Sequence, residues 1–391
     1  MNSEKLGPGG AALASGTEVL AYYEQVIAKL LRSGRLDFYP MCESVGEGRF
    51  HSLVEAGREY RVHVRKKTVD ATYMNVQVPS IRSPRYEVSP EAQLVPPNAL
   101  PRISKPPSAY VVIGAGKTGI DAVLFLLDRG VTPDLISWVM PNDAWLLDRA
   151  LIQPNRPFHS GMGGQLESFG AADSLDGLMT ALEERDLILR LDREVWPTKY
   201  RCATVSREEL ERLRLVKNVI RKGRVGRIDP TEIVLEEGTI PTQESVLHVD
   251  CTADGLARRP SRPLFEGDRI TLQSLFMCQQ VFSASVAAYV ETRFESDAEK
   301  NELCEPVPHP EFTRDFVLCM ATTMKNMGAW GKKFGWWLRA SRLCTAHHDS
   351  LLRLIANGIR SRRRLGDAGA GMMRLLEQEF PDLMSGQAPS A

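Results

Sequence analysis

The stretch AYVVIGAGKTG, residues 109–119, decides the fold that we expect for this chain. Its first half is a short run of apolar residues that favour strands, and its second half has the glycine pattern GxGxxG. Apolar residues then recur at helical spacing, at Ile120, Val123, Leu124 and Leu127. Gly130 stands where a helix would end, and a second apolar run follows over residues 135–140. Strand, glycine turn, helix and strand in this order form a βαβ unit.

Each glycine of the pattern has its own physical role in binding a dinucleotide. The pyrophosphate is bulky and doubly negative, so backbone N–H groups and a helix N-terminus must come close to it. Gly114 permits the tight turn, Gly116 leaves room for the phosphates, and Gly119 lets the helix pack on the strand. The predicted cofactor-binding loop also contains the residues between the glycines, Ala115, Lys117 and Thr118. The alternative is a glycine-rich turn between strand and helix that binds no ligand.

The loop also resembles the end of the phosphate-binding loop of ATPases. That loop has the pattern GxxxxGK[ST], and its first glycine would be residue 111. Val111 stands at this position, so we do not expect an ATPase.

The choice between NAD and NADP stays open at this point. An acid at the end of the second strand would bind the ribose hydroxyls of NAD, and a basic residue would admit the 2′-phosphate of NADP. Asp143 is the candidate acid, although it stands three residues beyond Met140, and Arg149 is later still.

Two segments of the chain end alike. A predicted meander precedes VDAT at residues 69–72, and another precedes VDCT at residues 249–252. Thr72 and Thr252 stand at matching places, so we interpret the two segments as related halves of nucleotide-binding domains.

The glycine loop, Trp138, the segment DAW at residues 143–145 and DCTADG at residues 250–255 together resemble the two-dinucleotide-domain flavoproteins. Within that group the chain is most similar to flavin-containing monooxygenase-like and pyridine nucleotide oxidoreductase-like proteins. The resemblance covers roughly residues 15–290 and implies one domain that binds FAD and a second, inserted domain that binds NAD(P)H. It also implies that Thr72 and Thr252 lie in the turns that link the domains near the cofactors; each threonine could instead simply end a strand.

We therefore expect an α/β protein with a Rossmann-like FAD/NAD(P)-binding fold, an inserted NAD(P) domain and a helical C-terminal extension. The expected parts are a partial FAD-type domain over residues 1–105, an NAD(P)-binding domain over 106–250, a return to the FAD-type domain over 251–295, and the helical extension over 296–391.

The first FAD motif of the resembled group has no counterpart before Ser15. Gly7, Gly9 and Gly10 form a glycine-rich segment, but no apolar strand precedes them. A parallel sheet without its inner strands would expose apolar edges. We therefore expect the chain to be N-terminally incomplete and to bind FAD poorly or not at all.

Outside the βαβ unit the sequence predicts further elements. Ser15 and Glu18 have capping-box spacing and precede apolar residues at helical intervals, which predicts a helix over residues 15–31. Eight prolines between residues 79 and 107 deny regular structure to most of a connecting segment. Strands are predicted at 36–39, 49–54, 59–64, 218–220, 224–228, 231–236 and 246–249. Helices are predicted at 178–190 and 208–215, and mainly helices from residue 282 onward.

The charge balance and the N-terminus exclude several classes of protein. Lys+Arg and Asp+Glu both total 49, which argues against a dedicated nucleic-acid binder. We interpret the one basic run, Arg360 and Arg362 to Arg364, as a solvated helix face. No apolar stretch reaches the roughly 18 residues of a membrane span, and residues 1–15 lack the apolar core of a secretory signal.

The cysteines indicate a reducing cytoplasm. The chain has 7 cysteines, an odd number, with no pair in CxxC spacing, so we expect free thiols. This spacing argues against a four-cysteine zinc site and against a thioredoxin-like redox pair. His347 and His348 are adjacent and cannot share a helix face as ligands, so we predict no metal site.

No motif identifies a catalytic side chain, since HExxH, GxSxG and a recognisable nucleophile–base set are missing from the sequence. The tryptophans at positions 330, 336 and 337 could cover a substrate cavity, but their helical spacing favours core packing. In flavoproteins the cofactors carry the chemistry.

The expected function is therefore that of a cytoplasmic FAD/NAD(P)-dependent oxidoreductase, of a monooxygenase-like kind, in which hydride passes from NAD(P)H to flavin. Its expected partner is a small-molecule substrate, rather than nucleic acid or membrane. A non-catalytic nucleotide-binding remnant or sensor is the first alternative. The second is a dehydrogenase without flavin, which needs a catalytic Lys, His or Tyr near the nicotinamide. Neither the substrate nor the oligomeric state is specified.

Overall fold

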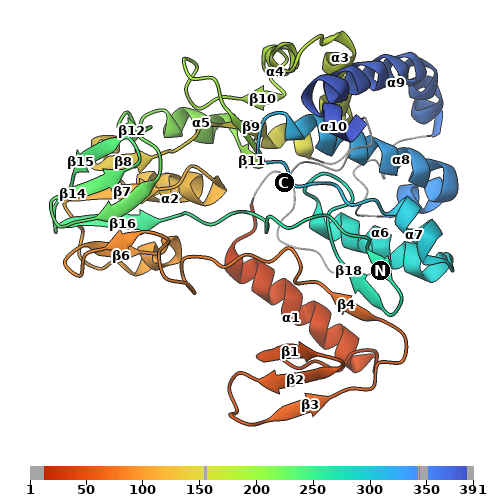
Figure 1. Cartoon of the computed structure of the whole chain (residues 1–391), viewed down its shortest axis with the longest axis horizontal. Helices are drawn as coiled ribbons and strands as arrows, with labels where there is room; N and C mark the ends of the chain where they lie inside the picture. Colours follow the sequence, from red (N-terminus) through yellow and green to blue (C-terminus); the bar gives the residue numbers. More distant parts are fainter. Residues whose placement is uncertain (1–12, 154–155, 342, 344–350, 385–391) are drawn as a thin grey trace. The chain divides into compact units, whose positions relative to one another are not determined.

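The computed structural model describes residues 13–153, 156–341, 343 and 351–384 (Figure 1). Its contacts separate it into two units, which we describe one at a time. The first unit is Met1–Asp70 with Phe265–Thr271, and the second is Ala71–Leu264 with Leu272–Ala391. This division is coarser than the four parts expected from the sequence, which stay a prediction.

The first unit begins with α1 (Gly16–Arg32), and the predicted capping box is confirmed. The Ser15 hydroxyl accepts from the Glu18 N–H at 3.2 Å, and the Glu18 carboxylate accepts from the Ser15 N–H at 2.7 Å. Both bonds satisfy N–H groups that the first helical turn leaves without partners, so the helix begins where the sequence indicates.

Two small sheets complete the first unit. β1 (Cys42–Gly46), β2 (Arg49–Ser52) and β3 (Glu59–Arg61) form an antiparallel sheet. β18 (Arg269–Thr271) pairs in parallel with β4 (Thr68–Asp70) and antiparallel with β17 (Phe265–Glu266).

The predicted strand at residues 36–39 is wrong. Tyr39 packs its ring on Phe50 and Tyr60, with centroids 4.7 and 5.1 Å apart. The aromatic side chain that suggested a strand therefore covers the antiparallel sheet from outside its hydrogen-bonded ladder.

In the second unit, a mixed α/β structure is confirmed by a five-stranded sheet in which every pairing is parallel. Its order is β12-β8-β7-β16-β6. The strands are β6 (Gln93–Val95), β7 (Ala109–Ile113), β8 (Ile136–Val139), β12 (Val219–Ile220) and β16 (Val246–Asp250). All residues of β16 are buried, as expected of a strand covered on both faces.

The predicted βαβ unit is confirmed as β7, α2 (Lys117–Asp128) and β8. The short 3₁₀ turn η2 (Pro133–Leu135) leads into β8. Gly130 follows the helix with a φ of +79°, the conformation that favours glycine after a helix. The apolar side of α2, including Ile120 and Val123, packs with Val112 and Trp138 of the sheet.

Opposite α2, a meander covers the sheet. It consists of β13 (Val225–Ile228), β14 (Glu232–Leu235) and β15 (Gly238–Pro241), and β5 (Glu87–Val88) pairs in parallel with β13. The predicted first strand of this meander, residues 218–220, belongs to the parallel sheet instead, because β12 pairs with β8. β5, β6 and the 3₁₀ helix η1 (Pro97–Arg102) lie in the proline-rich segment where the sequence predicted little regular structure.

A third sheet and the helices around it form a second core. Its order is β10-β9-β11, with β9 (Ala144–Asp148), β10 (Ile188–Leu189) and β11 (Lys199–Val205). Around it lie η3 (Arg149–Ile152), α3 (Arg156–Ala171) and α4 (Leu175–Glu184). After β11, α5 (Arg207–Leu213) instead packs with α2 against the parallel sheet. The helix predicted at 178–190 is too long, since its last part is β10.

The remaining described residues are mainly helical, as predicted. The helices are α6 (Gln280–Arg293), α7 (Asp297–Leu303), α8 (Asp315–Ala340), α9 (Leu351–Glu379) and α10 (Pro381–Met384). Trp330 of α8 is fully buried, and its indole N–H donates to Leu303 O at 2.6 Å, while Trp336 is exposed. Trp330 is therefore a core residue.

Two findings concern absences within the described part of the chain. No described helix is both long enough and apolar enough to cross a membrane. The described side chains also contain no group of three or more His, Cys, Asp or Glu arranged to hold a metal ion. The interpretations placed on Gly7, Gly9, Gly10, His347 and His348, and on the side chains of Arg360, Arg362 and Arg363, concern residues outside the described part.

Candidate dinucleotide site

The chain leaves β7 through a turn that only glycine fits. Gly114 has a φ of +124°, and a Cβ on this residue would lie 2.7 Å from the carbonyl oxygen of Cys251. Its N–H donates to Val139 O at 3.0 Å, and its carbonyl accepts from the Trp138 indole N–H at 2.9 Å. The turn is therefore held against both neighbouring strands, β8 and β16.

The other two glycines of the pattern differ from each other in their surroundings. A Cβ on Gly119 would lie 2.1 Å from Gly114 O, so the first turn of α2 touches the loop backbone directly. A Cβ on Gly116, the N-cap of α2, would meet no atom within 4 Å. One glycine thus allows close packing, and the other leaves open space in front of a helix N-terminus, as the sequence predicts.

That open space belongs to a cavity of about 530 Å³. It lies where β7 and β16 end, the edge at which parallel sheets of this kind bind ligands. Its walls come from the glycine loop, the segment after β16, the residues before β5 and the start of the meander. The lining residues are Arg85, Tyr86, Ile113, Gly114, Ala115, Gly116, Pro141, Asn142, Arg201, Arg224, Val225, Cys251, Thr252, Ala253, Asp254 and Arg258.

The lining of this cavity is strongly basic. Four arginines face a single carboxylate, Asp254. Arg258 pairs with Asp254 at 2.8 Å. The guanidinium groups of Arg85 and Arg224 have no carboxylate partner among the described residues, although the Arg224 backbone N–H donates to Glu236 at 2.9 Å, so both groups remain available for an anion.

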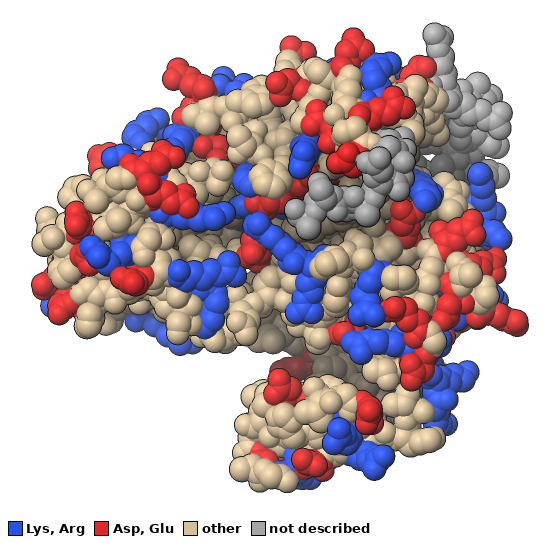
Figure 2. Space-filling model, viewed as in Figure 1, with Lys and Arg blue, Asp and Glu red and all other residues tan. Residues whose placement is uncertain are grey.

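The local excess contrasts with the face of the molecule that Figure 2 shows. On the face seen in Figure 2, basic and acidic side chains are interspersed. The cavity is therefore basic because of its own residues, in a chain whose formal net charge is zero.

Glu311 fixes two further arginines of the lining. Its carboxylate accepts from Arg201 Nε at 2.9 Å and Nη2 at 2.5 Å, and it lies 3.2 Å from Arg258. Burial raises its pKa, but hydrogen bonds from Arg201 and Lys199 outweigh this and lower the pKa of Glu311 to about 2. The carboxylate is thus charged at neutral pH and holds Arg201 in place.

Tyr86 is a further residue in the lining of the cavity. Its hydroxyl oxygen is buried and has no hydrogen-bond partner. Burial, with the nearby Asp250 and Cys251, raises the pKa of Tyr86, so the hydroxyl keeps its proton. Since a buried polar group without a partner is costly, this hydroxyl is a candidate ligand contact.

Among the predicted site residues, Gly114, Ala115, Gly116 and Thr252 line the cavity together. The Thr252 hydroxyl is already engaged, since it donates to Asp250 Oδ1 at 2.6 Å and accepts from Arg82 at 3.0 Å. It shapes the turn after β16.

The other predicted residues do not line the cavity. Lys117 pairs with Asp121 one turn along α2, and Thr118 is exposed. Asp143 is only 7% exposed and binds Arg221 through both carboxylate oxygens, at 2.7 and 3.0 Å. Thr72 is exposed, and its carbonyl accepts from the Asn75 N–H at 2.9 Å.

Sequence reasoning missed Arg85, Tyr86 and Arg224. The first two lie in the proline-rich segment, directly before β5, and the third directly precedes β13, the first strand of the meander. A single arginine has no local sequence motif that marks it as a binding residue. The only usable signal was the position of each residue next to a strand, and β5 was not among the predicted strands.

The fold and the cavity thus define a mixed α/β protein with a parallel sheet whose glycine turn opens on a basic cavity. No protein-family model matches the sequence. The chain is 44% identical over 380 residues to uncharacterized protein Mb2023 of Mycobacterium bovis, and equally to uncharacterized proteins MT2056 and Rv2000 of Mycobacterium tuberculosis. The match covers 93% of this chain and 70% of each relative. The chain belongs to the same family as these mycobacterial proteins.

Proposed function

We propose that this chain has a Rossmann-like fold and binds NAD(P)H in the cavity at the ends of β7 and β16, as part of a flavin- and nicotinamide-dependent oxidoreductase. One observation carries the proposal: Gly116 leaves open space in front of α2, and this space joins a cavity with two unpaired arginines. Such a combination of helix N-terminus, close backbone approach and guanidinium groups suits a diphosphate.

The residues fit the dinucleotide as follows. The N–H groups at the start of α2 face the open space at Gly116 and would bind the pyrophosphate. Arg85 and Arg224 would neutralise phosphate charge, and the Tyr86 hydroxyl would donate to a ribose or phosphate oxygen. When bound, the reduced nicotinamide supplies a hydride.

The charges around the cavity favour NADPH over NADH. NAD-specific sites use a free carboxylate to accept from the ribose hydroxyls. Here Asp254 is paired with Arg258, and Asp143 is engaged by Arg221. With no unpaired carboxylate among the described lining residues and two unpaired arginines, the additional 2′-phosphate of NADPH is the better complement.

A binding titration tests the site. We expect NADPH to bind more tightly than NADH, and Gly116→Val to weaken NADPH binding by about 100-fold or more, since its side chain would fill the phosphate space. Gly328→Val is the matched control, because Gly328 lies on α8 and a Cβ there also meets no atom within 4 Å. Equal NADPH affinity of Gly116→Val and the wild type would remove the site assignment.

The flavin part of the proposal rests on the resemblance alone. Among the described residues, one glycine turn between strand and helix opens on a cavity, and we derive no step through flavin from it. The test is the flavin absorbance of the purified chain after incubation with FAD. Stoichiometric FAD would contradict the expectation that this chain binds FAD poorly.

A nucleotide sensor is the second candidate, because the described lining has no His or Lys to act as an acid or base. A dehydrogenase without flavin would depend on Tyr86. NADPH oxidation with added FAD separates these functions: turnover supports the oxidoreductase, and tight binding without turnover supports the sensor. NADPH oxidation without FAD that needs an added carbonyl compound as hydride acceptor, and that is lost in Tyr86→Phe, supports the dehydrogenase.

A further inference from the structure

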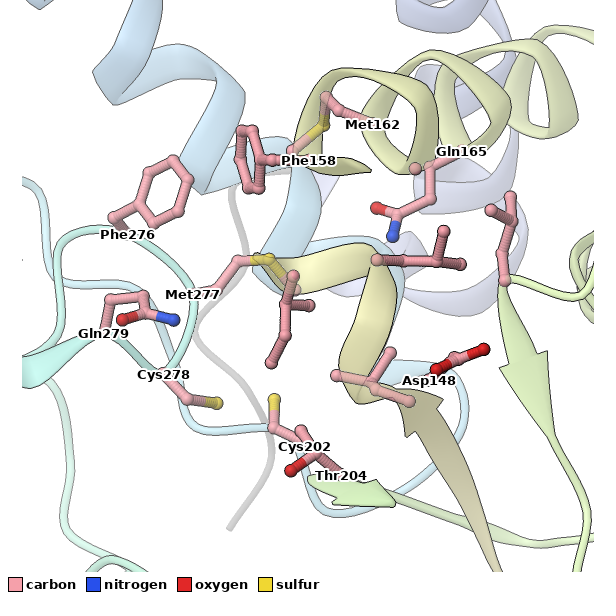
Figure 3. A pocket seen from close by; sticks show the side chains of 15 residues that line it. Asp148, Phe158, Met162, Gln165, Cys202, Thr204, Phe276, Met277, Cys278 and Gln279 are labelled. Atoms are coloured by element: carbon pink, nitrogen blue, oxygen red, sulfur yellow. The ribbon is translucent and has the colours of Figure 1, made fainter. Parts of the chain in front are cut away.

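A second cavity in the same unit contains two cysteines that are far apart in the sequence. Its volume is about 200 Å³, and most of its lining is apolar (Figure 3). Cys202 enters from β11, and Cys278 enters from the loop before α6. The lining residues are Leu147, Asp148, Leu151, Ile152, Phe158, Gly161, Met162, Gln165, Leu187, Cys202, Thr204, Phe276, Met277, Cys278 and Gln279.

The backbone has unusual conformations at Cys202 and directly before Cys278. The register of β11 on β9 shifts between Tyr200 and Thr204, and Cys202 within this bulge has a φ of +54°. Met277, directly before Cys278, has a φ of +42°. Residues other than glycine seldom adopt such conformations, and bulges often redirect side chains at functional sites.

The two thiols and a histidine form a cluster. In Figure 3 the Cys278 side chain is directed toward Cys202, and the Cys202 sulfur points into the cavity. His309 Nδ1 lies 3.7 Å from the Cys278 sulfur. Cys319 is a third thiol nearby, fully buried and outside the cavity lining. The sequence has no two cysteines in CxxC spacing, which argues against a thioredoxin-like pair. It does not exclude a pair of cysteines that are distant in the sequence and that the fold brings together.

The two thiols of the cavity differ in acidity. A hydrogen bond from Cys202 and the nearby His309 outweigh burial and lower the pKa of Cys278 to about 6. The pKa of Cys202 is raised well above its usual value by its hydrogen bond to Cys278 and by burial. Cys278, whose sulfur lies beside His309, is thus the more acidic of the two thiols, the division of roles that an attacking and a resolving cysteine need.

We propose that Cys278 and Cys202 form a dithiol site that reduces small hydroperoxides. The size and apolar lining of the cavity suit hydrogen peroxide or a short alkyl hydroperoxide and exclude a protein surface. This site shares no lining residue with the glycine-loop cavity, so it does not depend on the proposed nucleotide binding.

The reaction proceeds in two balanced steps. The Cys278 thiolate attacks one peroxide oxygen and the O–O bond breaks. The leaving alkoxide or hydroxide takes a proton from solvent, and Cys278 becomes a sulfenic acid. The Cys202 sulfur then attacks the sulfenic sulfur, and the sulfenic hydroxyl leaves as water with the Cys202 proton. Overall the two sulfurs lose two electrons and form a disulfide, while the peroxide gains the two electrons.

The test is a single oxidation of the full chain, reduced beforehand, with one equivalent of hydrogen peroxide or tert-butyl hydroperoxide. We expect a mass lower by two hydrogen atoms and, after non-reducing digestion, a linked peptide pair that contains Cys202 and Cys278. Cys304→Ser is the matched control, since Cys304 is a buried cysteine outside this cavity, and it should give the same product.

Two variants separate the roles of the thiols. Cys202→Ser should stop the reaction at the Cys278 sulfenic acid, which dimedone traps, and Cys202→Ala gives the same readout without a hydroxyl. Cys278→Ser should lose both the disulfide and the dimedone adduct. Oxidation that links other cysteines, or a dimedone adduct on Cys202 instead of Cys278, would overturn the proposal.

Alkylation gives an independent measurement of the thiolate. At pH 6 we expect iodoacetamide to modify Cys278 about tenfold faster than a free cysteine, because a larger thiolate fraction outweighs a lower intrinsic nucleophilicity. His309→Asn should lower this ratio. A Cys278 rate at pH 6 equal to that of a free cysteine would contradict the assignment of Cys278 as the attacking thiol.

Discussion

The glycine-loop cavity and the dithiol cavity are built in opposite ways. The first is centred on a continuous motif, in which the spacing of Gly114, Gly116 and Gly119 already specifies turn, open space and packing. The second joins Cys202 and Cys278 from separate elements through a bulge and a strained loop. A local sequence pattern can therefore indicate a candidate site that is formed by the backbone of one segment. A candidate site formed by side chains from distant segments can be recognised only in the folded structure.

The largest expected effect is on the local motif. Gly119→Val places a side chain where even a Cβ would lie 2.1 Å from Gly114 O. We expect the free energy of unfolding to fall by about 3 kcal/mol or more, as for severe overpacking. Urea denaturation measures it, with Gly328→Val as the control. A loss below about 1 kcal/mol would show that the glycine loop can shift to admit a side chain. The three glycines would then specify their cavity less strictly, and the contrast with the dithiol cavity would be weaker.

The next effect concerns Glu311, whose segment serves both cavities. Glu311→Gln should lower the free energy of unfolding at pH 7 by about 1–2 kcal/mol, after allowance for solvent screening. The folded pKa of about 2 lies below the usual 4.5, so this stabilisation is complete above pH 4.5 and is lost as the pH falls toward 2. Unfolding curves at pH 6 and pH 3.5 should show a smaller difference between variant and wild type at the lower pH. Glu208→Gln, at an exposed position, should show no such trend.

Arg224 tests the side-chain part of the glycine-loop cavity. Arg224→Gln should weaken NADPH binding by about tenfold, since it removes a charged contact to phosphate. Arg227→Gln is the matched control, because Arg227 lies on β13, the strand that Arg224 directly precedes, pairs with Asp229 and does not line the cavity. If both variants bind NADPH equally well, the cavity recognises its ligand by backbone alone, and the contrast between the two cavities becomes sharper.

The smallest expected effect is that of Asp143→Asn. Its carboxylate is engaged by Arg221 and does not line the cavity, so NADH and NADPH affinities should change by less than about twofold. A selective loss of NADH affinity, measured by the same titration, would restore Asp143 as the ribose ligand.

The sequence predicts those helices and strands that are specified by residues close together in the chain. Helix α1 has its capping box, and β7, α2, β8 and β16 have strong periodicity or apolar runs. β6 was missed because a short strand among prolines is ordered only by pairing with β16.

Helix α3 was also missed, since its glycines have low helix propensity. One of these glycines, Gly170, lies in a tight contact with α9, because a Cβ on it would lie 3.2 Å from the Cβ of Asp367. A Cβ on Gly371 of α9 would lie 1.8 Å from Phe169 O, so packing between α3 and α9 compensates for propensity.

The residues of the two cavities also differ in whether local sequence could predict them. The glycine loop was predicted because it follows the end of a strand, and Thr252 because VDCT repeats VDAT; both line the cavity. Arg85, Arg224 and the Cys202–Cys278 pair depend on which distant segments meet, and no spacing rule encodes that meeting.

Residues within the bulge of β11 line both cavities, so the number of residues in this strand is constrained. Arg201 lines the basic cavity and the next residue, Cys202, lines the apolar one, while Thr204 returns to the apolar side. Successive side chains of a strand point to opposite faces. Insertion of one residue after Tyr200 would therefore move the Arg201 guanidinium into the apolar cavity and the Cys202 thiol into the basic one. Only one register of β11 places both side chains in the cavities that they line.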